Sequence, residues 1–542
     1  MAKPIININS YPRVKINFSP EIPPLQKVRD KTKVNVRYCV VSPFTYVHIY
    51  WDSKIYEMVY EIEEPLLTAQ EKRWKDEITE AMREIIDFDV IVEKNEEALL
   101  KYIDSRFKLL ATELGFPIPY ESYRKIYYYL CRDFIGFNEA DPLLRDYFVE
   151  DIECNGSKTP VYIIHRIYRN LKTNLVYEDD ETLAGFIEKL AQRCGKYVSY
   201  ANPILDGSLP DGSRVNATYT KDITHKGPTF TIRKFTKTPW TPIQLISFRT
   251  LSPEMLAYLW LLVEYKMNLL IVGGTASGKT TLLNAIAFFI PPEARVVSIE
   301  DTLELNLPRE NWLPSVVRTS TGLEKVEEID LFTLLRASFR QAPDYVIVGE
   351  VRGKEAYVLF QGMASGHACI STMHADSVET VIKRLETPPI ELSPTLLNVL
   401  DCVCVMTHAI VKKQETRKLK EITEIVNVTP NGIAITQKPF VWNAADDQFY
   451  FKSTSKVFEK ISRRYGIARE ELELEFRKRV KLLYSLFQQK VFGFTEVQNV
   501  IDEYYKKPEK MLEAQVEFHQ LFKDVFTVPG IWPDMGSIPE AG

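Results

Sequence analysis

The chain has 542 residues, of which 45% are hydrophobic and 12% aromatic, so we expect two or three packed globular domains and not a disordered chain. A net charge of −5 argues against a protein whose main partner is a phosphate backbone, because such a protein needs a basic field. Seven cysteines without regular spacing indicate a reducing compartment and not a disulfide framework.

Residues 1–115 are predicted to form an N-terminal α/β extension that binds partners. A strand is expected at 45–51, and helical patterns follow at 67–88 and 96–116. Their charges of mixed sign are typical of solvated helix faces, and no chemistry is expected there. The start of the chain has no apolar segment of the kind found in secretory signals.

Residues 116–236 are predicted to form a second unit, with an aromatic helix and several short strands. A turn rich in glycine and proline presents Arg214, and Arg233 lies in the run TFTIRKF. Both arginines are candidates for fingers that reach a nucleotide when domains or subunits close. Two prolines then indicate a linker, which we place at 237–249.

In residues 250–430, apolar runs of strand length alternate with helix-length patterns. The alternation predicts an α/β domain with a doubly wound, mostly parallel sheet and helices on both faces. The most apolar window, 256–272, contains Glu264 and Lys266, so it is expected to be a helix followed by a buried strand and not a membrane span. Work at a membrane would then require a partner.

The last region, 431–542, is predicted to contain a strand pair and then helices. Its final residues have the composition of a loose tail. We find no internal repeat, so the chain is not expected to be a solenoid.

The run IVGGTASGKTTLLNA, at 271–285, contains the complete pattern G-x-x-x-x-G-K-[ST]. It follows an apolar run and opens a helical pattern, which is the context that a phosphate-binding loop requires. Lys279 is expected to reach the β- and γ-phosphates, and the Thr280 hydroxyl to bind Mg²⁺. The sequence therefore predicts a nucleoside triphosphate held by Gly273, Gly274, Thr275, Ala276, Ser277, Gly278, Lys279, Thr280 and Thr281.

Two acidic segments follow strand-like runs. In VIVGEVRG, Gly349 stands where a P-loop enzyme usually has a metal-contacting Asp, so Glu350 is expected to act on the Mg²⁺ shell through water. In SIEDTLE, three carboxylates lie at a carboxyl strand end, where such sheets bind ligands. The three carboxylates are Glu300, Asp301 and Glu304. Either one of them is a general base for the attacking water, or the segment is a solvated acidic turn, and the sequence does not decide between the two.

Histidines and arginines complete the candidate set. His367 and His374 flank a predicted strand without the spacing of a metal site, so a γ-phosphate contact is favoured for His374, although two ordinary boundary histidines would look the same. Arg336 and Arg340 lie four residues apart in a helical pattern. Beside a phosphate they would stabilise the transition state, and elsewhere they would be solvated charges.

Four segments occur in one order: the loop ending in GKT, IEDTLE, RQAPDYVIVGEVRG and GHACISTMHA. Together they resemble the P-loop, aspartate box, atypical Walker B and histidine box of the type II/type IV secretion ATPase superfamily. The resemblance extends back through LPDGSRVNA and IRKF and covers residues 115 to 430. The runs TASGKTT, FIPP and SIEDT look like the archaeal branch, which includes the archaellum motor ATPase and archaeal type IV pilus assembly ATPases.

The resemblance implies a RecA-like P-loop ATPase core with an α+β, PAS-like N-terminal lobe. It implies a cytoplasmic homo-hexamer that hydrolyses ATP with Mg²⁺ and acts on a polytopic membrane platform protein and other filament or secretion components, without nucleic acid. By the resemblance, Lys279 and Thr280 bind phosphate and Mg²⁺. Glu304 would be the base that activates water, and Glu350 would organise Mg²⁺. His374 would contact the γ-phosphate, and Arg214 and Arg233 would close on the nucleotide.

The chain departs from the family after GEVR, where Gly353 stands in place of a frequent acid. VMTHAIVKK and the long helical C-terminus favour the archaellum motor, and the alternative is an ATPase of an archaeal pilus or type II-like secretion system. Two other classes are a RecA-like nucleic-acid translocase, disfavoured by the net acidity, and a scaffold that binds ATP without turnover.

Overall fold

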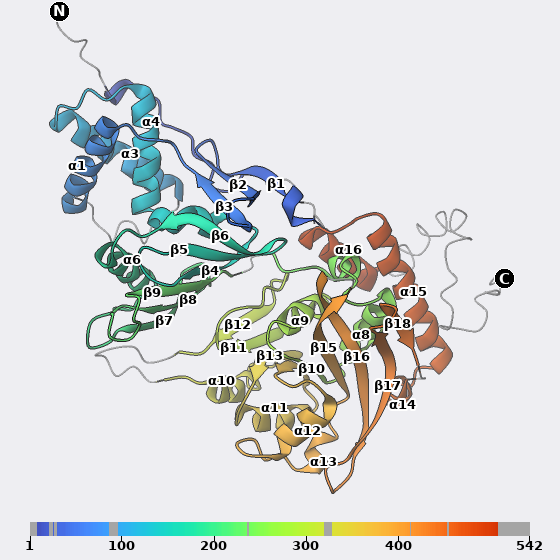
Figure 1. The fold of residues 1–542 in the computed structure, drawn as a ribbon. Helices are drawn as coiled ribbons and strands as arrows, with labels where there is room; N and C mark the ends of the chain where they lie inside the picture. Colours follow the sequence, from blue (N-terminus) through green and yellow to red (C-terminus); the bar gives the residue numbers. More distant parts are fainter. Residues whose placement is uncertain are drawn as a thin grey trace, which may run out of the picture. The chain divides into compact units, whose positions relative to one another are not determined.

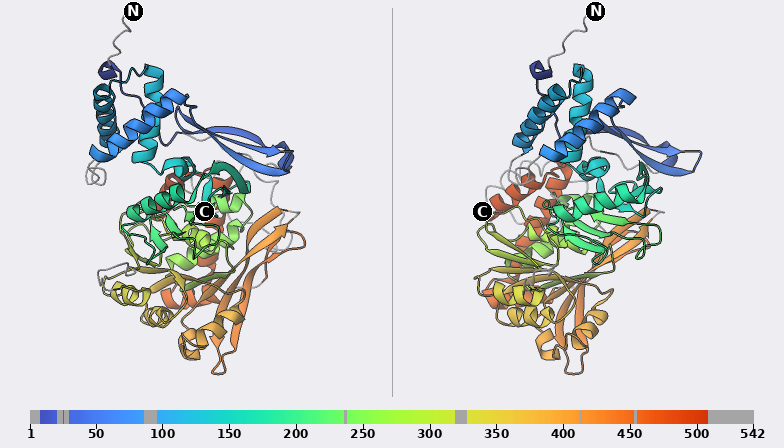
Figure 2. Two further views of the ribbon diagram at one scale, coloured as in Figure 1. Left: turned by 60° about the vertical axis from the view of Figure 1, so that its left-hand side comes forward. Right: turned by 90° about the vertical axis from the view of Figure 1, so that its left-hand side faces the viewer.

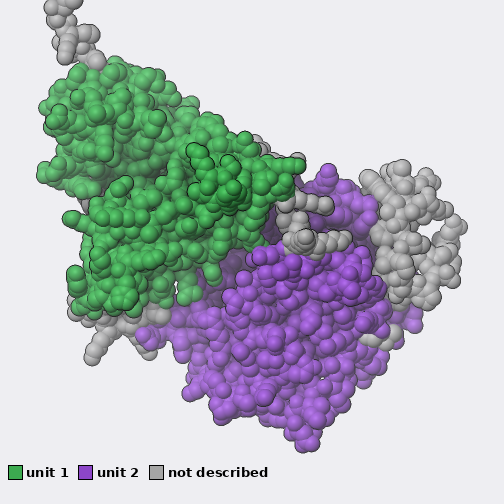
Figure 3. Space-filling view, in the orientation of Figure 1, with its two compact units in different colours: residues 1–235 green, residues 236–542 purple. Residues whose placement is uncertain are grey.

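The computed structural model describes residues 8–20, 25, 30–85, 96–235, 238–318, 328–411, 414–452 and 455–507. The chain divides into two compact units, Met1–Phe235 and Thr236–Gly542, which Figure 3 colours green and purple. Each unit has its own sheet and its own core, so each is described by itself.

Unit 1 joins a helical group to a mostly antiparallel sheet. Helices α1, α3 and α4 pack on one another, and Figures 1 and 2 show them together at one end of the unit. The elements are β1 (Asn35–Val41), β2 (Thr45–Asp52), β3 (Glu57–Glu63), α1 (Ala69–Ile85), α3 (Glu96–Glu113), α4 (Tyr120–Phe134), α5 (Asp141–Arg145), β4 (Val149–Cys154), β5 (Pro160–His165), β6 (Arg169–Val176), α6 (Asp180–Arg193), β7 (Ile204–Ser208), β8 (Arg214–Thr218) and β9 (Thr229–Arg233).

The sheet of unit 1 has the strand order β1-β2-β3-β6-β5-β4-β9-β8-β7. Its two halves meet at the parallel pair β3 and β6, with Val59 opposite Lys172 and Tyr60 opposite Thr173. The Asn174 side chain lengthens this joint, because it accepts from the Ile62 N–H and donates to the Ile62 carbonyl oxygen at 2.9 and 3.0 Å. Strands on both sides of residue 115 thus belong to one sheet.

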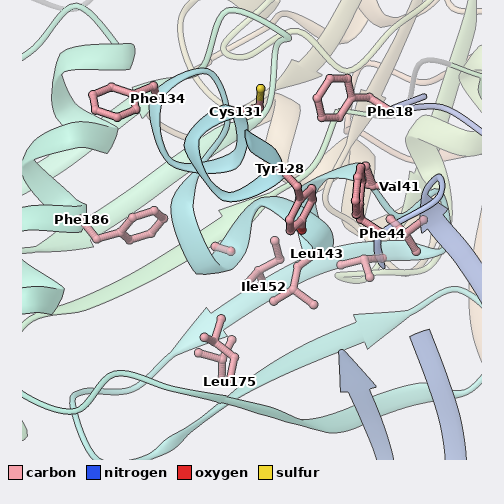
Figure 4. Packing of buried hydrophobic residues seen from close by; sticks show 14 of the residues in the cluster. Phe18, Val41, Phe44, Tyr128, Cys131, Phe134, Leu143, Ile152, Leu175 and Phe186 are labelled. Atoms are coloured by element: carbon pink, nitrogen blue, oxygen red, sulfur yellow. The ribbon is translucent and has the colours of Figure 1, made fainter. Parts of the chain in front are cut away.

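The core of unit 1 is shared in the same way. Figure 4 shows Phe44, Tyr128 of α4 and Ile152 of β4 in one cluster of buried side chains. Beside them, the buried Asp146 carboxylate accepts hydrogen bonds from the hydroxyls of Tyr38 and Tyr60 at 2.6 and 2.7 Å. Residues 1–115 and 116–235, which the sequence divides into two domains, therefore form one compact unit.

Unit 2 is a layered α/β unit. Its elements are α7 (Pro242–Ser247), α8 (Pro253–Glu264), β10 (Leu269–Gly273), α9 (Lys279–Ala287), β11 (Val296–Glu300), β12 (Trp312–Val316), α10 (Leu331–Ser338), β13 (Tyr345–Val351), α11 (Glu355–Ala364), β14 (Ala368–Met373), α12 (Val378–Glu386), α13 (Pro394–Leu397), β15 (Cys402–Val411), β16 (Gln414–Val428), β17 (Ala434–Asn443), β18 (Gln448–Phe451), α14 (Lys456–Tyr465), α15 (Arg469–Gln488) and α16 (Phe494–Lys506).

The strand order of unit 2 is β12-β11-β13-β14-β10-β15-β16-β17-β18, parallel from β12 to β15 and antiparallel beyond. Successive strand residues alternate between two cores. Leu269 and Ile271 face the core that contains α8, α9, α15 and α16, whereas Leu270 and Val272 face the core of α10, α11 and α12. The predicted α/β fold with helices on both faces of the sheet is confirmed.

Two local predictions differ from the structure, and a third falls outside the residues that it describes. Residues 242–247 of the expected linker form α7, because Thr241 and Gln244 make a capping box and Ile243 and Ile246 are buried. Arg340 lies beyond the end of α10, so it does not share a helical face with Arg336. The loose tail predicted for the last residues lies outside the described residues.

The described residues of the region predicted at 431–542 are built into unit 2. Strands β17 and β18 extend the sheet, and α15 packs against α8. The expected helices are present as α14, α15 and α16, with their apolar faces in the core that β10 also enters. In the part of the chain that the structure describes, no helix is both long and apolar enough to cross a membrane.

Candidate functional site

The predicted phosphate-binding loop connects β10 to α9, as the sequence indicates. Gly273 has φ 159°, and a Cβ at this position would lie 2.5 Å from Ser277 Oγ and 2.6 Å from the Met406 carbonyl oxygen. Gly278 caps α9 with φ 95° and ψ 24°, a left-handed conformation that glycine adopts without strain. A side chain at Gly273 would thus collide with its neighbours, and one at Gly278 would strain the main chain.

Lys279 begins α9 and is only 9% exposed. Its Nζ donates hydrogen bonds to the carbonyl oxygens of Gly273 and Gly274 at 3.2 and 3.1 Å. Burial lowers the pKa of the Lys279 amine, and the nearby carboxylates of Glu350 and Glu304 offset part of that effect. A buried amine held against its own loop, at a helix N-terminus, fits a phosphate chain as its ligand.

Arg417 of β16 also contacts the loop. Its Nε donates to the carbonyl oxygen of Ala276 over 2.8 Å, and Ala276 has φ 56°. Residue 417 is far from the loop in sequence, and nothing in its local pattern distinguishes it from other strand arginines. The contact follows from the pairing of β15 with both β10 and β16.

Glu350 lies in β13, and its two carboxylate oxygens have different surroundings. Oε2 accepts hydrogen bonds from Nε of Arg352, at 3.1 Å, and from Nη2 of the same guanidinium. Oε1 is buried and accepts no hydrogen bond from the described residues, with His374 Nε2 at 3.4 Å. This orphaned acceptor fits a water molecule of a Mg²⁺ shell, which is the role that the sequence predicts for Glu350.

His374 follows β14 and is 39% exposed at its side chain. Burial and the Lys279 ammonium lower the pKa of His374, while Glu350 acts in the opposite direction. His367 has a different environment, because its ring packs on Phe339 and its Nδ1 lies 3.3 Å from the Gly362 carbonyl oxygen. Of the two histidines, only His374 joins the carboxylate cluster.

Arg352 is a site residue that the sequence argument did not single out. Besides Glu350, its guanidinium lies 3.6 Å from Asp301 at the end of β11. Asp301, Arg352, Glu350 and His374 thus form a chain of charged and polar groups across the ends of β11, β13 and β14. The only sequence signal for Arg352 was its place two residues after Glu350.

Gly353, which stands where the family often has an acid, lies next to the carboxylate of Glu355. The Glu355 carboxylate accepts hydrogen bonds from the main-chain N–H groups of Arg352 and Gly353 at 2.6 and 2.7 Å. A Cβ on Gly353 would lie 3.1 Å from Glu355 Oε2. An acid two residues further along the chain therefore occupies the space next to Gly353.

The three acids of the aspartate box differ sharply in exposure. Glu300 is buried, and its Oε1 accepts the N–H groups of Glu304 and Leu305, each at 3.0 Å. Burial raises the pKa of Glu300 to about 7. Asp301 and Glu304 are exposed. Of the two exposed acids, Asp301 lies beside the Arg352 guanidinium. Glu304 therefore stays the candidate base.

Within the described residues, no group of three or more His, Cys, Asp or Glu side chains could hold a metal ion. Mg²⁺ in nucleotide sites is typically held by one or two protein oxygens together with phosphates and water. The Thr280 hydroxyl in the first turn of α9 and the orphaned Glu350 Oε1 fit this mode.

Arg214 and Arg233 lie in unit 1 and are direct register partners on β8 and β9. Arg233 Nε lies 3.0 Å from Asp151 and Arg214 Nε 3.6 Å from Asp206, and both guanidinium side chains are largely exposed. The two arginines therefore lie opposite each other on neighbouring strands. Each is paired with a carboxylate on the strand at its other side, Asp206 on β7 and Asp151 on β4.

Comparison with known proteins gives a consistent result. A family model described as "Type II/IV secretion system protein" matches residues 144–438. The uncharacterized protein MJ0900 of Methanocaldococcus jannaschii is 36% identical over 496 residues, which cover 87% of this chain and 89% of the relative. The type IV secretion system protein PtlH of Bordetella pertussis is 34% identical over 218 residues, or 36% of this chain and 64% of PtlH. The crystal structure of the VirB11 ATPase from the Brucella suis type IV secretion system, in complex with sulphate, is 25% identical over 52% of this chain and 90% of that chain, with a TM-score of 0.27.

Proposed function

The chain belongs to the type II/IV secretion system protein family, and on that premise we propose that it is a motor ATPase that hydrolyses ATP at the loop between β10 and α9. The single observation that carries this proposal is the buried, orphaned Oε1 of Glu350 beside His374, in the same cluster of charges as Lys279. This buried oxygen accepts no hydrogen bond from the described residues, so it can accept one from a metal-bound water.

In the proposed reaction, Lys279 and the loop N–H groups bind the β- and γ-phosphates. Mg²⁺, when bound at Thr280, would neutralise charge that develops on the phosphate oxygens. Glu304 accepts a proton from the attacking water, whose oxygen forms a bond to the γ-phosphorus as the bond to the bridging oxygen of ADP breaks. Glu350 would orient the water molecules of this Mg²⁺, and His374 contacts the γ-phosphate.

We propose that this reaction drives a filament or secretion machine of an archaeal cell. Its relative in Methanocaldococcus jannaschii, matched along most of both chains, supports the archaeal branch. In this proposal the chain forms a cytoplasmic hexamer, in which Arg214 and Arg233 close on nucleotide, and it drives archaellum assembly and rotation through a polytopic membrane platform protein. Assembly of an archaeal type IV pilus, or a type II-like secretion system, is the alternative.

Phosphate release by the purified chain with ATP and Mg²⁺ tests the enzymatic part. We expect turnover that disappears on chelation of Mg²⁺ and that DNA and RNA do not stimulate. Stimulation by either nucleic acid with a steep salt dependence would instead favour the translocase. Deletion of the gene tests the machine, since loss of swimming with pili retained supports the archaellum motor, and loss of pili alone supports the alternative.

A further inference from the structure

Glu300 is a buried carboxylate that the proposed reaction does not use. It ends β11 with 2% exposure, and its Oε1 accepts the main-chain N–H groups of Glu304 and Leu305 at 3.0 Å each. Its Oε2 is buried without a hydrogen bond from the described residues, so Glu300 does not reach solvent. Glu300 therefore fixes the main chain that carries the exposed side chain of Glu304.

Asn284 holds the same segment from helix α9, where it is 4% exposed. Its Nδ2 donates to the carbonyl oxygens of Glu304 and Thr280 at 3.4 and 3.2 Å, and its Oδ1 accepts from the Asn306 N–H at 3.1 Å. One buried amide thus links the residue proposed to bind Mg²⁺ with the residue proposed as the base.

Gly349 leaves the space that Glu300 needs. A Cβ on Gly349 would lie 3.0 Å from Cγ and 3.5 Å from Cβ of Glu300. An Asp at this position, as P-loop enzymes usually have, would crowd the Glu300 side chain, which would have to shift by a few tenths of an ångström. The unusual Gly-Glu end of β13 and the buried Glu300 are therefore two parts of one arrangement.

We propose that Glu300 and Asn284 are positioning residues, which hold the main chain of Glu304 at a fixed place relative to Thr280. The Glu304 carboxylate then meets the attacking water in one orientation. This inference rests on the proposed function, because it takes Glu304 as the base. Small displacements of a catalytic group reduce the chemical step much more than they reduce substrate binding.

The kinetic test compares Glu300→Ala, Glu300→Gln and Asn284→Ala. We expect Glu300→Ala and Asn284→Ala to lower kcat roughly 10- to 100-fold with the Kd for ATP changed less than about threefold. Glu300→Gln should keep kcat within about threefold, because its amide oxygen can accept both N–H bonds. In a Glu304→Gln background, Glu300→Ala should lower kcat no further, and an equal fold-loss in both backgrounds would overturn the proposal.

Hydrogen–deuterium exchange without nucleotide gives a second readout. Glu300→Ala and Asn284→Ala should increase uptake at residues 301–306, whereas Glu300→Gln should not. Glu424 is a matched control, since this buried carboxylate of the same unit accepts the Lys456 N–H at 2.7 Å and takes no part in the site. Glu424→Ala should increase uptake around 455–458 and leave 301–306 unchanged.

Unchanged uptake at 301–306 in both alanine variants would overturn the proposal. If Glu300→Ala does not fold, Asn284→Ala decides by the same criteria. Absence of ATP turnover in the unsubstituted chain would refute the proposed function, while the exchange experiment would still decide whether Glu300 and Asn284 hold the segment.

Discussion

Arg417 donates a hydrogen bond from Nε to the carbonyl oxygen of Ala276, and so ties strand β16 to the left-handed residue of the phosphate loop. We predict that Arg417→Ala weakens ATP binding about tenfold, because a hydrogen bond from a charged donor contributes roughly 1.5 kcal/mol. Titration with a fluorescent ATP analogue measures the change. Lys420→Ala, at an exposed position of the same strand, should leave affinity unchanged, and an equal loss in both variants would point to a nonspecific charge effect.

Lys279→Ala should abolish nucleotide binding while the fold persists. The Nζ atom contacts the loop carbonyl oxygens of Gly273 and Gly274, so its removal leaves the core intact. We expect affinity for ATP to fall at least about 100-fold, as for the loss of a charged phosphate contact in a partly buried site. Lys266→Ala removes another lysine of unit 2, one that pairs with Asp344 at 3.0 Å, and should bind normally. Normal binding by Lys279→Ala would refute the assignment of the loop.

Gly273→Ala should destabilise unit 2. The new Cβ would lie 2.6 Å from the main-chain oxygen of Met406, which belongs to the paired strand β15 and cannot turn aside. We expect a loss of roughly 1–3 kcal/mol in unfolding free energy, measured by urea denaturation. Gly274→Ala is the matched control for stability, since a Cβ there meets nothing within 4 Å among the described atoms. Similar losses in both variants would mean that the loop is already loose.

Glu300 should make stability depend on pH. Burial raises its pKa from 4.5 to about 7, so the folded chain binds this proton more tightly than the unfolded chain does. The stabilisation that protonated Glu300 provides is complete below pH 4.5 and is lost as the pH rises through about 7. Relative to Glu300→Gln, the original chain should therefore lose up to roughly 3 kcal/mol over this interval. Urea denaturation of both proteins from pH 5 to 8 measures the difference, and parallel curves would contradict it.

Arg233→Ala should lower turnover much more than ATP affinity. In unit 1 this side chain is exposed and lies 3.0 Å from Asp151, and we propose that it reaches nucleotide when the ring closes. A loss of roughly 10³-fold in kcat is the scale expected for an arginine finger. Lys221→Ala, which removes an exposed lysine of the same unit, should leave kcat unchanged. Equal losses of kcat and affinity for Arg233→Ala would instead assign the residue to binding.

Local patterns were enough to predict the elements that carry the nucleotide loop. The apolar run before Gly273 and the helical pattern after Lys279 determine β10 and α9, and the other boxes contain or overlap the buried strands β11, β13 and β14. The pattern could not reveal Arg352 and Arg417, because their contacts depend on which strands are neighbours in the sheet.

The roles within SIEDTLE could not be separated for a related reason. Glu300 and Glu304 are equally acidic in sequence, and only the packing of β11 decides that one is buried while the other is exposed. Helix α7 was missed although its start was readable, since Thr241-Pro242-Ile243-Gln244 is a capping box followed by apolar residues. Two prolines in the segment indicate a linker, but Pro242 occupies the first turn of α7, where proline is well tolerated.

The joint between β3 and β6 is the place where the strands on the two sides of residue 115 are hydrogen-bonded to each other. It consists of the pairs Val59–Lys172 and Tyr60–Thr173 and the two hydrogen bonds between the Asn174 side chain and the main chain of Ile62. The Tyr38 and Tyr60 hydroxyls on Asp146 are a second fastening. These contacts join β1–β3 to the strands of Arg214 and Arg233 within one sheet, so we expect a substitution at Asn174 to loosen the first three strands from the rest of unit 1.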